Sequence, residues 1–287
     1  MTLPVIIGLA GPELADDEAQ LLREYPPRGV ILFSRNISTP FQVRQLNAIL
    51  RQILAPDAVL MVDQEGGRVA RLRAPHWRNL PPAAALKTPE AALAHGKALG
   101  VMVKEAGFTM TAAPVLDLRY EGASDVVGDR ALSHDPQVVA ALGAQIAEGI
   151  MAAGITPIIK HIPGHGRAQI DSHEGLPKIA RDADLSADFF PFIANNKLPW
   201  AMTAHIVYEA YDTLPATLSA KVIAEIIRGK IGFTGTLVSD DLAMGALSGT
   251  PAERAVGALQ AGCDVALYCP GDMAGNRAVL EAVANGH

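Results

Sequence analysis

The chain contains very little cysteine, with only Cys263 and Cys269 among its 287 residues. If both lie on one extended strand, their six-residue separation corresponds to roughly 20 Å at about 3.3 Å per residue. A disulfide needs Cα atoms within about 7 Å of each other. Two free thiols are therefore predicted, which argues against a disulfide-held scaffold and suits a reducing compartment such as the cytoplasm.

An excess of basic charge and a long apolar run are also missing. The 24 Lys and Arg residues face 30 Asp and Glu residues, for a net charge of −6, which argues against a broad nucleic-acid surface. The first apolar stretch, Leu3–Ala10, is short, follows no basic residue and runs into Gly11-Pro12. We interpret it as a first strand and predict neither a signal peptide nor a membrane span there.

Hydrophobic residues make up 49% of the chain and charged residues 19%, enough for a large core. Short apolar runs recur, separated by stretches of helical character. The runs are Val5–Leu9, Gly29–Phe33, Val59–Asp63, Phe108–Pro114, Ile155–His161, Trp200–His205, Gly235–Asp240 and Asp264–Cys269. This alternation is typical of α/β proteins with parallel sheets. Eight units favour a (β/α)8 TIM-type barrel over an open doubly wound sheet, with residues 1–287 forming a single domain.

Helix boundaries are well marked. The segments beginning at Thr39-Pro40 and Thr250-Pro251 both fit a capping box with proline at the first helical position. Gly107, Gly154 and Gly262 each stand just before a predicted strand. There a left-handed residue would end the helix and turn the chain back.

Polar residues stand where the apolar runs stop: Asp63, Lys160, His161, His205 and Asp240. One such residue is often a cap, but these five come from four different predicted strands. Active sites in this barrel are built at the C-terminal ends of strands. The sequence therefore predicts a functional site at that end.

The densest polar segment runs from Lys160 to His173. Lys160 and His161 offer donors for sugar hydroxyls or an anionic group, and the glycines after them allow a loop that moves. Asp171 and His173 are two positions apart and face the same side in extended backbone. There the carboxylate would orient the imidazole and favour its protonated form, as in a general acid/base dyad.

Metal binding by His161, His165, His173 and Asp171 is the competing interpretation. Their spacing fits no compact zinc pattern, and no predicted helix presents them together, so no metal is predicted. For His165, a structural role inside a tight loop is favoured over catalysis.

The segment Gly235–Leu242 is an apolar run that ends in two aspartates, of which only one need face the barrel mouth. Asp240 is the better candidate nucleophile because it ends the run itself. Asp241 would cap the next helix or hold a neighbour.

Near the third run, Asp63 can accept hydrogen bonds from sugar hydroxyls. The glycines that follow it lack the Lys-Ser/Thr of a P-loop and the spacing of a dinucleotide fingerprint. Arg71 and Arg130 are candidate ligand contacts, although a lone arginine is more often solvated or paired.

Three segments together resemble a known family: Lys160–Gly166 with Asp171-Ser172-His173, Asp63–Arg68, and Gly235–Leu242. They are similar to the bacterial single-domain β-N-acetylhexosaminidases of glycoside hydrolase family 3, and the resemblance runs from about Gly8 to Cys269. The histidine-rich segment is specific to this branch, whereas Ser-Asp-Asp is shared more widely. One departure is the shortened continuation 243–246, which affects the rim of the pocket.

The resemblance implies a retaining exo-β-N-acetylglucosaminidase that uses no cofactor. It would release N-acetylglucosamine from peptidoglycan-derived muropeptides in cytoplasmic cell-wall recycling, as a monomer without nucleic-acid or membrane partners. Asp240 becomes the nucleophile, and His173, assisted by Asp171, the acid/base. The implied substrate contacts are Asp63, Arg71, Arg130, Lys160 and His161.

A histidine acid/base departs from the carboxylate pair of most retaining glycosidases, but one residue near neutral pKa can serve as acid and then as base. Multi-domain β-glucosidases of the family take this residue from a second domain. No second domain is expected here, so the barrel must supply it. A related glycosidase or phosphorylase of other sugar specificity, and a sugar-binding barrel without catalysis, remain alternatives.

Overall fold

The computed structural model describes residues 2–172 and 175–286. These residues form a closed barrel of eight parallel strands, in the order β1-β2-β3-β4-β5-β7-β9-β10 and back to β1. The barrel strands are β1 (Leu3–Gly8), β2 (Pro27–Leu32), β3 (Val59–Val62), β4 (Met110–Thr111), β5 (Thr156–Ile162), β7 (Trp200–Thr203), β9 (Thr236–Asp241) and β10 (Val265–Tyr268). All the predicted strands are present, and the predicted (β/α)8 barrel is confirmed.

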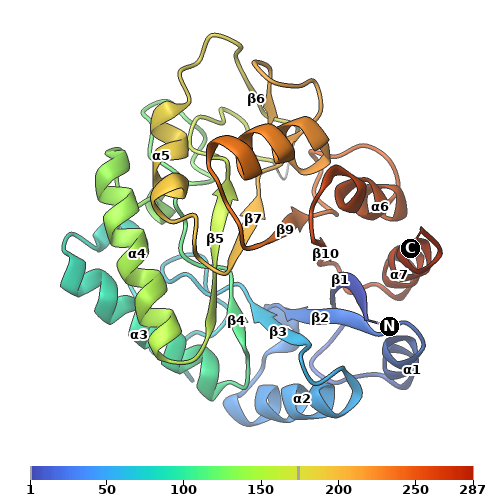
Figure 1. Cartoon of the computed structure of the whole chain (residues 1–287). Coiled ribbons are helices and arrows are strands. Elements are labelled where there is room, and N and C mark those ends of the chain that lie inside the picture. The colour runs from blue at the N-terminus through green and yellow to red at the C-terminus, as the bar shows by residue number, and fades with distance from the viewer. Residues whose placement is uncertain (1, 173–174, 287) are drawn as a thin grey trace.

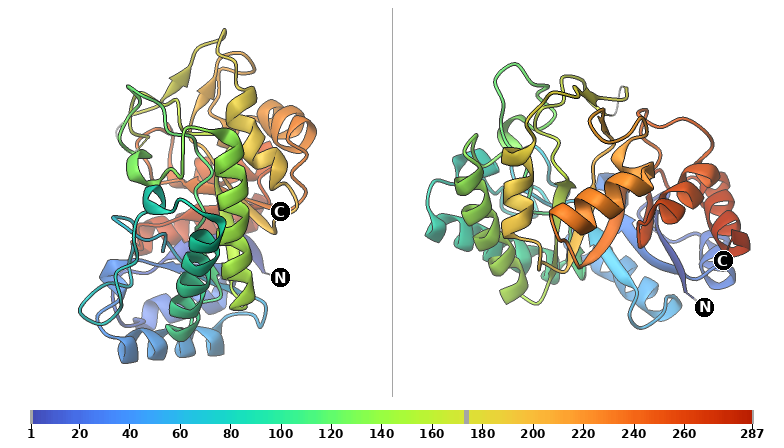
Figure 2. Two further views of the ribbon diagram at one scale, coloured as in Figure 1. Left: turned by 90° about the vertical axis from the view of Figure 1, so that its left-hand side faces the viewer. Right: turned by 45° about the horizontal axis from the view of Figure 1, so that its top comes forward.

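A helix follows each barrel strand and packs on the outside of the sheet (Figure 1). The helices are α1 (Asp16–Glu24), α2 (Pro40–Ile53), α3 (Pro89–Glu105), α4 (Pro136–Ala152), α5 (Ser186–Ala194), η5 (Val222–Lys230, a π-helix), α6 (Pro251–Ala261) and α7 (Met273–Gly286). Figure 2 shows the same outer layer of helices from two further directions. None of the helices in the described part of the chain is both long and apolar enough to cross a membrane.

Shorter elements decorate the loops that follow the strands. They are the 3-10 turns η1 (Ser34–Asn36), η2 (Ala83–Ala85), η3 (Gly128–Arg130) and η4 (Ala216–Leu218), and a small parallel sheet of β6 (Lys178–Ile179) with β8 (Val207–Tyr208). Because β6 follows β5 and β8 follows β7, this sheet ties together two loops at the C-terminal end of the barrel.

The helix signals are confirmed with one correction. Thr250 and Glu253 form the complete reciprocal capping box of α6. At α2, Thr39 accepts the N–H of Gln42, but the Gln42 side chain accepts the N–H of Ser38. The predicted box is therefore only half present, because the amide reaches one residue further back. The three glycines before strands all have positive φ, at +91° for Gly107, +82° for Gly154 and +113° for Gly262.

Two apolar layers hold the barrel together. Inside it lie side chains from every strand: Ile6, Ile31, Val59, Met61, Met110, Ala112, Ile158, Trp200, Met202, Val238, Val265, Leu267 and Cys269. The second layer fills the space between the strands and the helices. Successive strand residues point to opposite faces, so each strand serves both layers.

Cys263 and Cys269 are both buried free thiols, as predicted. They flank β10 at opposite ends. Among the strand ends, β4 differs most from the expected Phe108–Pro114, since it ends at Thr111. Proline has no N–H to donate, and the Ala113 N–H bonds back to the Thr111 carbonyl, so regular strand geometry ends there. The carbonyls of Ala113 and Pro114 still accept N–H groups of β5.

Candidate active site

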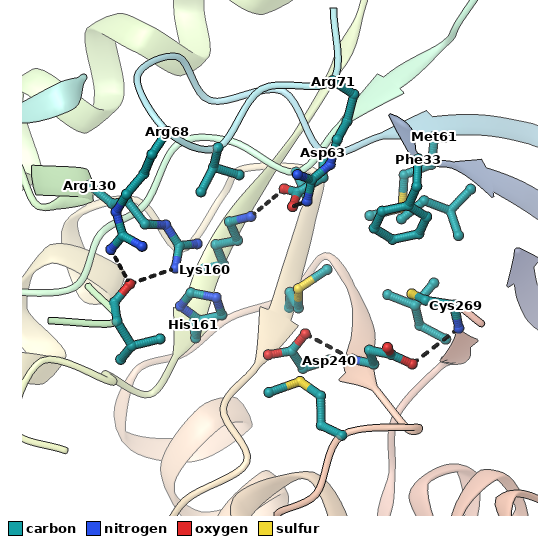
Figure 3. A pocket seen from close by; sticks show the side chains of 18 of the residues that line it. Phe33, Met61, Asp63, Arg68, Arg71, Arg130, Lys160, His161, Asp240 and Cys269 are labelled. Atoms are coloured by element: carbon teal, nitrogen blue, oxygen red, sulfur yellow. Dashed lines mark hydrogen bonds and ion pairs between the residues drawn. The ribbon is translucent and has the colours of Figure 1, made fainter. Parts of the chain in front are cut away.

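A cavity of about 230 Å³ opens at the C-terminal ends of the strands. Its floor is the top layer of the barrel interior, formed by Ile31, Met61, Ala112, Met202, Leu267 and Cys269. Figure 3 shows Asp240 across the cavity from the Asp63–Lys160 pair, with Phe33 and Cys269 on one side and Arg68 and Arg130 on the other. The predicted location of the site at this end of the barrel agrees with the structure.

Seven of the eight predicted site residues line this cavity. They are Asp63, Arg71, Arg130, Lys160, His161, Asp171 and Asp240. The eighth, His173, lies outside the described residues. The structure therefore brings together residues separated by more than 170 positions in the chain, while their chemical roles stay predictions.

The two-residue repeat of strands explains why the polar side chains enter the cavity. Asp63, Lys160 and Asp240 each stand two positions beyond a core residue of the barrel interior, and so face the same way. Those core residues are Met61, Ile158 and Val238. The inward face changes from apolar to charged at the level where the barrel opens.

Two irregularities in strand pairing add further side chains to the cavity. The register of β5 against β7 shifts between Lys160 and Ile162, and both Lys160 and His161 line the pocket. The register of β10 against β9 also shifts, so that both Asp240 and Asp241 line it. Bulges re-aim side chains and are common beside active sites. The sequence analysis required only one of these two aspartates at the barrel mouth, but the bulge between β9 and β10 brings both into the cavity lining.

An ion network forms one wall of the cavity. Lys160 Nζ lies 2.8 Å from Asp63 Oδ1 and 2.6 Å from Glu65 Oε1. Arg71 Nη2 donates to Asp63 Oδ2 at 2.8 Å. Arg130 makes a two-pronged contact with Glu65, through Nε at 2.9 Å and Nη2 at 2.7 Å. Both candidate arginines are therefore paired and also face the ligand cavity.

Burial alone would raise the pKa of Asp63, but the charges of Lys160 and Arg71 outweigh it and hold that pKa well below its usual range. In Glu65, burial is likewise outweighed by Arg130 and Lys160, and the pKa is lowered. The network thus presents fixed carboxylates and fixed cationic donors, which suit the hydroxyl groups of a sugar.

Asp117 is a central residue that sequence reasoning missed. Its carboxylate is buried and lies 2.6 Å from His161 Nδ1 through Oδ2, and it accepts the His165 N–H at 2.7 Å through Oδ1. Burial would raise the pKa of Asp117, yet His161 lowers it to about 2. A carboxylate bound to Nδ1 sets the orientation of an imidazole, so Asp117 aims His161 at the cavity.

Glu65, like Asp117, was not among the predicted site residues, and the sequence carried a weak signal for both. Asp117 follows the apolar run Ala112–Leu116, and Glu65 stands two positions after Asp63. Each is a polar residue beyond a strand end, but neither belongs to the expected strand itself. Only the folded loops bring them into contact with His161, Lys160 and Arg130, which line the cavity.

The two aspartates after β9 have opposite tendencies. Burial raises the pKa of Asp241, whose Oδ1 accepts the N–H groups of Ala243 and Cys269. For Asp240, burial is outweighed by His161 above all, and the pKa is lowered. Of the two aspartates, Asp240 therefore ionises more readily. Asp241 holds the neighbouring strand through the Cys269 N–H, which is one of the two roles predicted for it.

The loop after β5 packs tightly on its neighbours. Gly166 approaches Leu118 so closely that a Cβ would lie 2.1 Å from the Leu118 carbonyl oxygen. His165 is buried, and its Nε2 lies 3.1 Å from Ser172 Oγ. The Ser172 carbonyl accepts the Ala246 N–H at 3.1 Å. The shortened segment after Asp241 thus supports the loop that carries Asp171, and the predicted structural role of His165 agrees with these contacts.

Metal binding finds no support in the described residues. No group of three or more His, Cys, Asp or Glu side chains within 2–172 and 175–286 is placed to hold a metal ion. Nδ1 of His161 is bound to Asp117, and Nε2 of His165 is bound to Ser172. His173, the remaining histidine of that interpretation, lies outside these ranges.

His165 makes the stability of the protein depend on pH. Burial lowers the pKa of His165 to about 4, compared with about 6.5 in an unfolded chain. The fold favours the neutral imidazole. The contribution of His165 to the free energy of unfolding is therefore present above pH 6.5 and is lost as the pH falls toward 4. Between pH 7 and pH 5 the wild type should lose about 2 kcal/mol of unfolding free energy from this residue. Urea unfolding at both pH values measures this loss. The His165→Gln variant should lose about 2 kcal/mol less than the wild type between pH 7 and pH 5, and equal losses in the two proteins would contradict the assignment.

Comparisons with known proteins identify the family. The model of the Glycosyl hydrolase family 3 N terminal domain matches residues 5–287. The chain belongs to glycoside hydrolase family 3. It is 40% identical over 280 residues to a beta-hexosaminidase of Alkalilimnicola ehrlichii, covering 93% of this chain and 80% of that one. A Pseudomonas aeruginosa beta-hexosaminidase is also 40% identical, over 274 residues, 92% of this chain and 82% of that one.

Solved structures of family 3 agree. A β-N-acetylglucosaminidase from Paenibacillus sp. superposes with a TM-score of 0.92 at 33% identity, covering 99% of this chain and 56% of that longer one. NagZ from Neisseria gonorrhoeae, in complex with N-trifluoroacetyl-D-glucosamine, has a TM-score of 0.86 at 31% identity, covering 98% and 90%. The prediction of a family 3 glycosidase similar to the beta-hexosaminidases is confirmed.

Proposed function

We propose that this family 3 enzyme is a retaining exo-β-N-acetylglucosaminidase. The observation that carries the proposal is the ionised, cavity-facing Asp240 opposite a wall of paired carboxylates and cations. A carboxylate of lowered pKa is unprotonated at neutral pH and can attack an anomeric carbon. The wall offers both acceptors and donors for the ring hydroxyls of a terminal sugar.

In the first step, Asp240 attacks the anomeric carbon while an acid protonates the leaving oxygen, giving a glycosyl-enzyme. In the second step, the residue that acted as the acid serves as a base. It takes a proton from water as the water oxygen attacks the anomeric carbon, and the bond to Asp240 breaks. We propose His173 for this acid/base, assisted by Asp171, which lines the cavity. The hydrogen bond from the Ala246 N–H to the Ser172 carbonyl supports this part of the proposal. It holds Ser172, the residue after Asp171, beside the loop that follows β9.

Asp63, Arg71, Arg130, Lys160 and His161 are proposed to bind the terminal sugar. Their contacts with one another or with Glu65 and Asp117 support this role. The side chains are positioned before a ligand enters, which lowers the entropic cost of binding. The cavity floor is apolar and sulfur-rich, and suits the faces of a sugar ring and a methyl group better than a charged substituent.

We propose N-acetylglucosamine as the sugar released, from muropeptides derived from peptidoglycan, in the cytoplasm and by a monomer. Two of the similar structures support the sugar, one being a β-N-acetylglucosaminidase and the other holding an N-acylated glucosamine. The buried free thiols suit a reducing compartment.

The test is hydrolysis of matched aryl β-N-acetylglucosaminide and aryl β-glucoside by the wild-type protein, followed by proton NMR. Turnover of the N-acetylated sugar with the β-anomer appearing first is expected. Faster turnover of the glucoside would overturn the specificity, and α-product at the start would overturn retention. A parallel reaction with inorganic phosphate separates hydrolysis from phosphorolysis, since formation of a glycosyl phosphate would identify a phosphorylase.

A further inference from the structure

His205 is a buried polar residue that the proposed chemistry does not use. It follows β7, where Met202 faces the barrel interior, and it is three positions further along. His205 and Thr203 therefore project from the opposite face of the chain, toward Thr217 in η4. All three side chains are fully buried, and they lie behind the barrel wall.

These side chains form a closed hydrogen-bonded ring with the backbone of the proposed nucleophile. The Asp240 N–H donates to Thr203 Oγ1 at 3.3 Å, and Thr203 Oγ1 lies 2.7 Å from Thr217 Oγ1. Thr217 Oγ1 lies 2.7 Å from His205 Nδ1. His205 Nε2 lies 2.9 Å from the carbonyl oxygen of Asp241, which closes the ring.

The proton positions in this ring follow from the atoms at its two ends. A carbonyl oxygen only accepts, so His205 Nε2 carries a hydrogen and donates to Asp241. Burial lowers the pKa of His205, so Nδ1 is unprotonated and accepts from the Thr217 hydroxyl. Thr217 Oγ1 then accepts from Thr203, and Thr203 Oγ1 accepts from Asp240 N–H. The single hydroxyl hydrogen of Thr217 also lies within reach of the Ala204 carbonyl, at 3.2 Å from Oγ1, but the 2.7 Å contact with His205 Nδ1 is shorter. In this direction every member of the ring is satisfied.

The ring lies on the β7 side of the nucleophile, where the ladder between β7 and β9 has ended while the pairing of β9 with β10 continues to Asp241. The pairing of β7 with β9 runs from Trp200–Thr236 to Met202–Val238, two positions before Asp240. The bulge against β10 follows at the same place. Buried backbone groups need partners. Here Thr203 of β7 bonds the Asp240 N–H and His205, just after β7, bonds the Asp241 carbonyl, while Thr217 of η4 bonds both side chains.

The ring also reaches the reactive carboxylate itself. Asp240 Oδ1 accepts the Asp241 N–H at 2.8 Å, and the carbonyl of Asp241 is the group that His205 holds. We propose that Thr203, Thr217 and His205 are positioning residues that fix the Asp240–Asp241 backbone and thereby aim the Asp240 carboxylate at the anomeric carbon. This inference rests on Asp240 being the nucleophile.

Thr217→Val tests the inference because it removes the central hydroxyl and keeps the shape of the side chain. The readout is the rate of covalent labelling by 5-fluoro-N-acetylglucosaminyl fluoride, followed by intact-protein mass. Fluoride leaves without acid assistance, so the rate reports on the nucleophile alone. We expect labelling and kcat to fall on the order of 10- to 100-fold, with KM little changed, since small displacements of a reacting group have effects of this size.

Matched variants separate positioning from general damage. Thr217→Ser keeps the hydroxyl and should restore labelling to within a few-fold of wild type. Thr39→Val removes a hydroxyl that caps α2 on the outside of the barrel, and should lower the melting temperature without changing the labelling rate. Thr203→Val should act like Thr217→Val, and the double variant should be no slower than either single one, because both break the same ring.

The outcomes are distinguishable. Wild-type labelling by folded Thr217→Val, with none by Asp240→Ala, would overturn the ring and leave the nucleophile in place. If Thr217→Val does not fold, the labelling rate of Thr203→Val decides in the same way. Wild-type labelling by Asp240→Ala would instead overturn the proposed nucleophile, and the positioning role with it.

Discussion

Asp240→Ala should lower kcat for an aryl β-N-acetylglucosaminide on the order of 10⁴- to 10⁶-fold, the size of loss seen when a covalent nucleophile is removed from an enzyme. Asp240 is a carboxylate of lowered pKa that lines the cavity, and it faces the Asp63–Lys160 pair across it. Steady-state hydrolysis and the labelling experiment measure the loss. Asp57→Ala is the matched control, since Asp57 is exposed and pairs with Arg28 ahead of β3, at the opposite end of the barrel from the cavity, and its kcat should match that of wild type.

Azide, added as an external nucleophile, gives this experiment a second readout. Alanine leaves space on the face of the sugar from which Asp240 would attack, so azide should enter there and displace an activated aryl group directly. The product expected from a β-glycoside is the α-glycosyl azide, formed with one inversion. A folded Asp240→Ala variant that retains more than a tenth of wild-type activity would contradict the nucleophile.

His173→Ala should show a loss that depends on the leaving group. Loss of general acid catalysis costs about 10²- to 10⁴-fold for a poorly leaving alcohol or phenol. A 2,4-dinitrophenolate group leaves without needing a proton, so the first step with that substrate should proceed near the wild-type rate. The glycosyl-enzyme should then accumulate, with a burst of released dinitrophenolate. Measuring kcat/KM across a series of aryl leaving groups tests this directly, with His76→Ala, an exposed histidine, as control.

Azide distinguishes this variant from the first. It needs no general base, so it should attack the glycosyl-enzyme of His173→Ala from the face opposite Asp240. Two inversions give the β-glycosyl azide, the opposite anomer from that expected of Asp240→Ala. A uniform loss for all leaving groups, without azide rescue, would remove His173 from the acid/base role and direct attention to another group on the same loop.

Much of the fold and of the site could be predicted because both depend on local patterns. Apolar runs of strand length alternating with capped helices indicated the barrel, and polar residues at the ends of those runs indicated its working end. The resemblance to family 3 placed the candidate residues, and seven of them line one cavity. At Thr39 the local signal was only half right, because a glutamine side chain can reach either of two neighbouring N–H groups.

What the sequence determined by itself is the order of the elements and the chemical character of each strand end, because both follow from periods of 2 and 3.6 residues along the chain. Tertiary structure alone decided the strand registers. The two bulges bring His161 as well as Lys160, and Asp241 as well as Asp240, into the cavity lining, and they depend on how β5 pairs with β7 and β9 with β10. The pairing of Glu65 with Arg130, and the contact of Asp117 with His161, likewise exist only once separate loops meet around the same cavity.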